Sequence, residues 1–139
     1  MFGIIPMSWS SVIQSALRIA AGLSFMTHGT QKLFAWPVTQ AREPVELLTQ
    51  SGLAGVLETF GGALMIVGLL TRPVAFILAG QMAWAYFQAH APRSVWPVLN
   101  GGEPAMLFSF IWLFFAAAGP GPISLDAMLW RRRPARRRV

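Results

Sequence analysis

The 139-residue chain contains no cysteine, which excludes disulfide bonds, thiolate nucleophiles and cysteine-ligated iron–sulfur clusters. Charged residues are also scarce, at 12% of the chain, whereas a typical soluble domain carries about 25%. Hydrophobic residues make up 55% of the chain, and the mean hydropathy is +0.53. One domain of this size cannot bury so much apolar surface in a water-soluble core. The composition therefore predicts a small integral membrane protein.

Among the few charged residues, acids are the rarer kind, with 5 Asp and Glu against 11 Lys and Arg, for a net charge of +6. Six of the arginines lie within residues 131–139. A basic tail binds nucleic acid in some proteins, but beside a membrane span it more often marks the cytoplasmic side and contacts anionic headgroups. We therefore predict a basic cytoplasmic tail over residues 127–139, with anionic lipid rather than nucleic acid as its partner.

Four apolar segments are separated by short polar, proline-containing or glycine-containing connections, and they lie at about residues 12–34, 52–70, 74–90 and 104–118. The fourth is short for a membrane crossing. The pattern predicts an all-α polytopic membrane protein, a four-helix transmembrane bundle in up-down-up-down order. This domain is expected to cover residues 1–126.

The arginines in the connections predict the orientation of the bundle. Arg72 lies in the tight turn between the second and third segments, and the arginine tail follows the fourth. The two longer connections offset their arginines with glutamates, namely Arg42 with Glu43 and Glu46, and Arg93 with Glu103. The positive-inside rule then places both termini in the cytoplasm of a multi-pass protein of the bacterial inner (plasma) membrane.

The first segment carries its polar residues on one face. At about 100° per residue, four of them fall within an arc of about 80°, namely Gln14, Arg18, His28 and Lys32. Gly22 and Gly29 lie close to the same face, and small residues let a neighbouring helix approach. One Arg or Lys at a helix centre costs roughly 2.5–3.5 kcal/mol in hydrocarbon, so we expect this face to contact protein.

The predicted orientation brings polar groups from three segments to a similar depth. Glu58 lies near the outer end of the second segment and is the predicted counter-ion of Lys32, and Gln88 lies at the outer end of the third. The candidate polar intramembrane site therefore comprises Arg18, His28, Lys32, Glu58 and Gln88. Arg18 lies roughly 20 Å deeper than Lys32 and has no acid at its level, so headgroups or backbone carbonyls are its expected partners.

The two histidines raise the question of a haem or metal site. His90 lies about 180° around the third helix from Gln81, which predicts that it leaves the inner face. A set of His28, Glu58 and His90 offers too few certain ligands for a metal ion. We therefore predict no metal site and no covalently bound cofactor.

Several short motifs, taken in order, resemble the DoxX family. HGTQK at residues 28–32 is similar to the family's first-helix motif, and Arg18 and Gly22 precede it at the matching spacing. ETFGGALMIVGLLTR at residues 58–72 resembles the second-helix pattern. NGGEPA at residues 100–105 and GPGPISLD at residues 119–126 match the start and the end of the fourth helix. The resemblance extends from about residue 18 to residue 126, and the arginine tail departs from it.

The resemblance implies a four-helix membrane bundle with a link to respiratory or redox chemistry. A related archaeal pair acts as a thiosulfate:quinone oxidoreductase, and other members are associated with membrane oxidoreductase complexes that defend against oxidants. The resemblance carries over no catalytic residues. It does identify Arg18, His28, Lys32, Glu58 and Arg72 as positions that match the family's motifs.

We expect a membrane subunit of a quinone-linked oxidoreductase, with a quinone as its non-covalent cofactor and a soluble or membrane redox protein as its electron-donating partner. In this hypothesis His28 and Lys32 donate hydrogen bonds to a quinone carbonyl, and Glu58 relays a proton. The alternatives are a purely structural polar core, a non-enzymatic scaffold for a soluble redox protein, and a carrier for a small anion or lipid. The sequence leaves open whether the chain is an enzyme, which substrate it takes and its oligomeric state.

Overall fold

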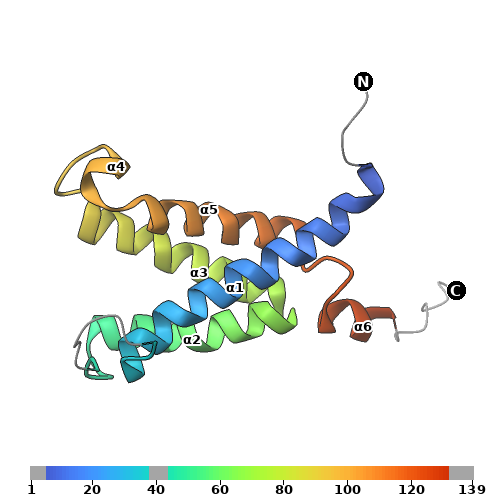
Figure 1. The fold of residues 1–139 in the computed structure, drawn as a ribbon, viewed down its shortest axis with the longest axis horizontal. Coiled ribbons are helices and arrows are strands. Elements are labelled where there is room, and N and C mark those ends of the chain that lie inside the picture. Colours follow the sequence, from blue (N-terminus) through green and yellow to red (C-terminus); the bar gives the residue numbers. More distant parts are fainter. Residues whose placement is uncertain (1–5, 38–43, 132–139) are drawn as a thin grey trace, which may run out of the picture.

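The computed structural model describes residues 6–37 and 44–131, which are helical with no β-strand. Four long helices dominate the fold: α1 (Ser10–Phe34), α2 (Gln50–Val67), α3 (Thr71–Ala85) and α5 (Glu103–Ala118) (Figure 1). The shorter elements are the 3-10 helix η1 (Met7–Trp9), the π-helical turn η2 (Tyr86–His90), α4 (Pro97–Asn100) and α6 (Leu125–Arg131). The prediction of an all-α protein is therefore confirmed.

Three of the four predicted segments agree closely with α1, α2 and α5, and the third differs in its local geometry. The α-helical part of that segment ends at Ala85, and the chain continues as the π-helical turn η2 to His90. The predicted domain boundary at residue 126 falls inside α6, and residues 132–139 of the predicted tail lie outside the described residues.

Glycines set how closely α1 packs along α2. A Cβ atom on Gly29 would lie only 2.4 Å from the backbone nitrogen of Thr59, and a Cβ atom on Gly62 would lie 2.8 Å from the carbonyl oxygen of Gly22. No side chain larger than hydrogen fits at such distances without moving one of the helices. The predicted role of Gly22 and Gly29 as contact points for a neighbouring helix is therefore correct, and the neighbour is α2.

A second helix pair, α3 and α5, packs against the first through an aromatic core. Phe25 of α1 contacts Trp112 of α5, with ring centroids 5.3 Å apart and the rings nearly perpendicular. Met65, Leu78 and Phe115 are also buried at this junction. Edge-to-face aromatic contacts contribute stabilisation beyond the area that they bury, so this cluster joins the two pairs near the middle of the molecule.

The end of the molecule that carries the α2–α3 turn and residues 119–124, here called the closed end, is held together by Arg18. This residue is fully buried. Its Nε donates to the carbonyl of Pro120 at 2.9 Å, its Nη1 to those of Met65 and Ile66, and its Nη2 to that of Ile123. The sequence left lipid headgroups or backbone carbonyls as the expected partners of Arg18. The structure shows backbone carbonyls, to which a charged donor forms strong hydrogen bonds.

Two further side chains complete the closed end. The carboxylate of Asp126 accepts hydrogen bonds from the backbone N–H groups of Leu70 at 2.9 Å and Thr71 at 2.8 Å, and so caps the start of α3. Arg72 donates from Nη1 to the carbonyl of Ala117 at 2.7 Å, at the end of α5. Cations at helix C-termini and carboxylates at N-termini are favourable, so Arg72 and Asp126, the last residues of the 58–72 and 119–126 stretches, stabilise helix ends.

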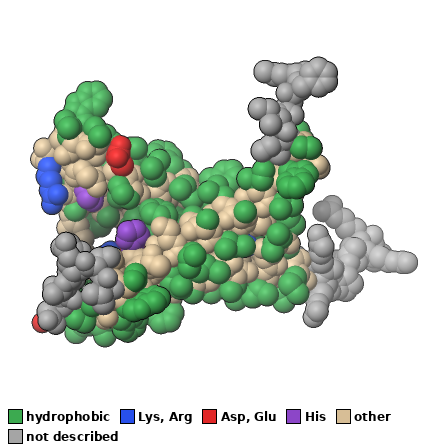
Figure 2. Space-filling view, viewed as in Figure 1, with side chains coloured by type: hydrophobic (Ala, Val, Ile, Leu, Met, Phe, Trp, Pro, Cys, Tyr) green, Lys and Arg blue, Asp and Glu red, His purple; other side chains and the backbone are tan. Residues whose placement is uncertain are grey.

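Large apolar side chains remain exposed along all four long helices, among them Leu23, Phe60, Phe76 and Phe110. Figure 2 shows hydrophobic side chains over most of one face, while charged and histidine side chains gather at one end. Within the described residues, α2 alone is long and apolar enough to cross a membrane by its length and composition, and α5 is apolar but shorter.

Candidate functional site

The predicted ion pair between Lys32 and Glu58 is present. Lys32 lies in the last turn of α1, and its Nζ is 2.5 Å from Oε1 of Glu58 on α2. The two side chains differ in burial, because Lys32 is 36% exposed and Glu58 is 2% exposed. The lysine thus approaches a buried carboxylate from a partly open position, and the pair lies at the end opposite the Arg18 cluster.

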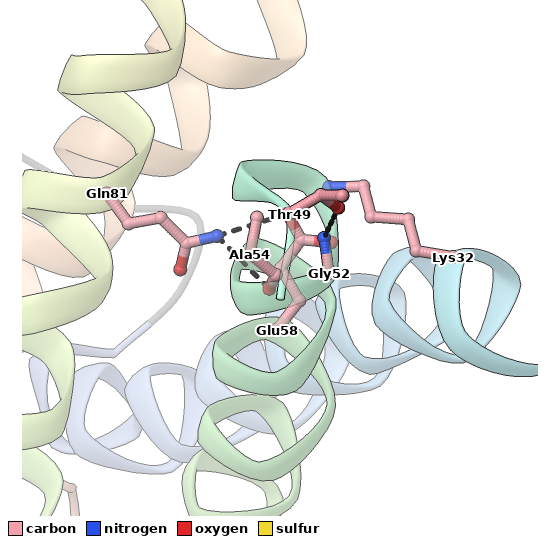
Figure 3. Close-up of polar contacts among 6 residues, drawn as sticks. All are labelled: Lys32, Thr49, Gly52, Ala54, Glu58 and Gln81. Atoms are coloured by element: carbon pink, nitrogen blue, oxygen red, sulfur yellow. Dashed lines mark hydrogen bonds and ion pairs between the residues drawn. The ribbon is translucent and has the colours of Figure 1, made fainter. Parts of the chain in front are cut away.

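A third side chain, Gln81 of α3, joins this pair. Its Nε2 donates to Oε1 of Glu58 at 3.1 Å and reaches the carbonyl of Ala54 at 3.4 Å. Figure 3 shows Gln81 and Lys32 approaching Glu58 from different helices. The predicted site did not include Gln81. The available signal was its seven-residue spacing to Gln88 in the same predicted segment, because seven residues of regular helix return to nearly the same face.

The Lys32–Glu58–Gln81 cluster opens onto a cavity of about 800 Å³ between the two helix pairs. This volume is within the range of about 300–1,000 Å³ that small-molecule sites occupy. Its walls are mainly apolar, and six polar side chains line it: His28, Lys32, Gln50, Glu58, Gln81 and His90. The cavity lies toward the end where α1 finishes, α2 begins and the 91–102 connection lies, here called the open end.

Both histidines line this cavity, which corrects the expectation for His90. That expectation assumed a regular α-helix after Gln81, but residues 86–90 form a π-helical turn in which Ala91 N–H donates to the carbonyl of Tyr86. Each residue of a π-helix advances by less than 100°, so the face of His90 changes. His90 Nδ1 lies 3.1 Å from the carbonyl of Asn100, so Nδ1 is the donor and Nε2 is the acceptor in the neutral ring.

Two of the five predicted site residues lie outside the cavity. Gln88 is exposed and exchanges hydrogen bonds with Gln50 at the open end. Arg18 belongs to the closed end, where backbone carbonyls surround it. Among the predicted residues, His28, Lys32 and Glu58 are therefore the ones that the fold brings together.

Glu58 has an unusual hydrogen-bonding state for a buried carboxylate. Its Oε1 accepts from both Lys32 and Gln81, but its buried Oε2 has no partner among the described residues. A buried polar atom without a partner carries a free-energy cost of roughly 1–3 kcal/mol. The arrangement therefore provides one hydrogen-bond acceptor, or one proton donor when Glu58 is protonated, beside the Lys32 ammonium group.

Among residues 6–37 and 44–131, no group of three or more His, Asp or Glu side chains is placed to hold a metal ion. His28 instead lies edge-on to Phe108, with ring centroids 6.3 Å apart. The described cavity thus combines hydrogen-bonding groups with apolar and aromatic walls, a combination that suits a small organic molecule.

Comparison with known proteins gives the family. The profile of the DoxX family matches residues 13–91, which include most of α1 and all of α2, α3 and η2. An uncharacterized protein of Haemophilus influenzae is 37% identical over 125 residues, a match that covers 84% of this chain and 90% of that protein. No solved structure matches the chain. The chain therefore belongs to the DoxX family of membrane proteins.

Proposed function

We propose that the four long helices cross the bacterial inner membrane in up-down-up-down order, with both termini in the cytoplasm. The exposed apolar side chains on all four helices support this arrangement. Arg72 lies at the closed end and six arginines follow in residues 131–139, whereas the two connections at the open end carry one arginine each, which is the asymmetry that the positive-inside rule uses. The closed end then faces the cytoplasm, and the cavity lies in the outer half of the membrane.

We propose further that the cavity binds a quinone headgroup, and that the chain is the membrane subunit of a quinone-linked oxidoreductase. One observation carries this proposal: a cavity of about 800 Å³ lies beside a buried carboxylate that has an unpartnered oxygen and a lysine 2.5 Å from its other oxygen. Intramembrane ionisable residues that face a cavity are frequent in proton and substrate pathways. A quinone has the matching chemistry, since it carries carbonyl acceptors on an apolar ring.

The side chains have separate roles in this proposal. Lys32 and His28 donate hydrogen bonds to a quinone carbonyl, and Glu58 delivers a proton to the reduced oxygen. A quinone takes up two electrons and two protons to become a quinol. The electrons come from a redox protein partner, because the chain has no cysteine for an iron–sulfur cluster of its own. The protons enter from the open end, where Lys32 is 36% exposed.

The cavity also separates this proposal from two of the alternatives, the scaffold and the carrier. A scaffold needs no cavity beside an ion pair, and a carrier needs access from both sides of the membrane. The Arg18 cluster occupies the closed end, where four backbone carbonyls surround the guanidinium group. An arrangement with access from one side favours a binding site over a transport path.

The test is quinone binding to the purified protein and its variants. The wild-type protein, purified gently from membranes, is expected to retain a quinone that mass spectrometry identifies, and to bind added ubiquinone analogues. Glu58→Gln and Lys32→Met should each raise the Kd at least about tenfold, equivalent to about 1.4 kcal/mol. The matched controls Glu103→Gln and Arg93→Met remove the same charges from exposed positions outside the cavity and should leave the Kd unchanged.

Two outcomes would count against the proposal. One is a wild-type protein that neither retains nor binds a quinone. The other is equal binding by the cavity variants and the control variants.

A further inference from the structure

The cavity has two long sides, and aromatic contacts bridge the one between α1 and α5. Phe25 contacts Phe108 with ring centroids 5.2 Å apart, and His28 lies edge-on to Phe108. Phe25 also contacts Trp112 toward the middle of the molecule. These ring contacts join α1 to α5 along this side of the cavity.

The side between α2 and α3 is framed by two contacts that lie far apart. Toward the middle of the molecule, α3 packs directly on Gly61, whose Cβ would lie 2.7 Å from Leu78. At the open end, Gln88 donates to Gln50 at 3.2 Å. The eleven residue-to-residue steps from Gln50 to Gly61 correspond to about 16 Å of helix. Within this interval, Gln81 crosses from α3 and brings its amide to Glu58.

The side chains that line this interval are apolar and exposed. Leu53 and Leu57 come from α2, and Ile77 and Trp84 come from α3. Their exposed fractions are 58%, 40%, 55% and 63% respectively, although all four also line the cavity. The same cavity therefore has hydrogen-bonding groups at Glu58 and an apolar margin that reaches the outer surface of the helices.

Gly80 of α3 lies in the same apolar margin but has no side chain to fill it. It lies three residues after Ile77 and four before Trp84, so all three share one face of the helix. Gly80 is exposed, lines the cavity, and has no atom within 4 Å of the position that a Cβ would occupy. The glycines between α1 and α2 are required by close packing, but Gly80 leaves open space.

We propose that the opening framed by Leu53, Leu57, Ile77, Gly80 and Trp84, here called the α2–α3 portal, admits a ligand with a long apolar tail from the lipid. The headgroup lies at Lys32 and Glu58, and the tail passes over Gly80 into the bilayer. This inference rests on the proposed quinone site and specifies its substrate class. The ligand is a lipid-soluble quinone with an alkyl or isoprenoid tail, rather than a small water-soluble quinone.

The test compares two quinones that have the same headgroup. One is 2,3-dimethoxy-5-methyl-1,4-benzoquinone, which has no tail, and the other is its decyl derivative. Isothermal titration in detergent gives the Kd of each for wild type, for Gly80→Phe and for Ala20→Phe, which adds the same side chain at an exposed position on α1 outside the cavity. Each variant is compared with wild type for the same ligand, so partition of the tail into the micelle cancels.

Gly80→Phe is expected to raise the Kd of the decyl quinone at least about tenfold and to change that of the tail-less quinone by less than about twofold. Ala20→Phe should change neither. Gly80→Leu, a smaller and helix-favouring substitution, is measured in parallel and should show the same preference at about threefold.

Equal effects of Gly80→Phe on the two quinones, or no effect on the decyl quinone, would overturn the portal and leave the headgroup site intact. Failure of the wild-type protein to bind either quinone would overturn both the headgroup site and the portal. The two failures are therefore distinguishable in one set of titrations.

Discussion

Glu58 and Lys32 form one ion pair, but the loss of each partner has a different physical consequence. Removing Lys32 leaves a carboxylate that is 2% exposed without its cation. Removing the charge of Glu58 leaves an ammonium group that is 36% exposed and can reach water. An uncompensated buried charge is expensive, whereas an exposed one costs little. The stability of the protein should therefore depend more on Lys32 than on the charge of Glu58.

We predict that Lys32→Met lowers the stability of the detergent-solubilised protein by about 1–3 kcal/mol, below the range for fully buried pairs because Lys32 is partly exposed. Glu58→Gln should cost less than about 1 kcal/mol, since Gln81 can still bond to the amide oxygen. The double variant should recover most of the loss caused by Lys32→Met. Thermal denaturation of the three variants measures these differences, and strictly additive losses would show that the two side chains are not coupled.

Gly29 and Gly80 are both helical glycines, but they lie in different surroundings. Both are in regular helix, where alanine is intrinsically favoured over glycine by roughly 1 kcal/mol. Gly29 is buried against the backbone of α2, whereas Gly80 is open. Substitution by alanine should therefore change the stability of the protein in opposite directions at the two positions.

We predict that Gly29→Ala destabilises the protein by about 1–3 kcal/mol, because its Cβ would lie 2.4 Å from the backbone nitrogen of Thr59 and would force α1 away from α2. Gly80→Ala is the matched control, and it should be neutral or stabilising by up to about 1 kcal/mol. Thermal denaturation in detergent checks both variants. A neutral Gly29→Ala would mean that α1 and α2 pack less closely than the structure shows.

At the scale of the whole molecule, the proposed orientation places the 91–102 connection outside the cell and the C-terminus inside. An alkaline phosphatase fusion, which is active only after export, should therefore be inactive at the C-terminus. A fusion within the 91–102 connection is the matched control and should be active. The reverse pattern would invert the protein in the membrane and place the cavity in the cytoplasmic half.

The fold of the individual elements was predictable because helical periodicity is a local property of the chain. The apolar run placed α1 at nearly its observed bounds, and the predicted up-down order of the helices brought Lys32 level with Glu58. Proline, glycine and polar connections indicated where the long helices end. The pairing of Lys32 with Glu58 also followed, because an unpaired charge in apolar surroundings is costly and each residue was the other's nearest opposite charge at that depth.

The cavity and its complete set of residues depended on the tertiary structure. A cavity depends on how two helix pairs cross, which is decided by glycine contacts and aromatic packing between residues distant in sequence. The π-helical turn brought His90 to a face that regular helical geometry does not predict, and Gln81 joined Glu58 across a gap between helices. Arg18 shares a helical face with Lys32, yet its hydrogen bonds are all at the closed end. Helical periodicity gives the direction of a side chain around the helix, but it does not identify the group that the side chain contacts.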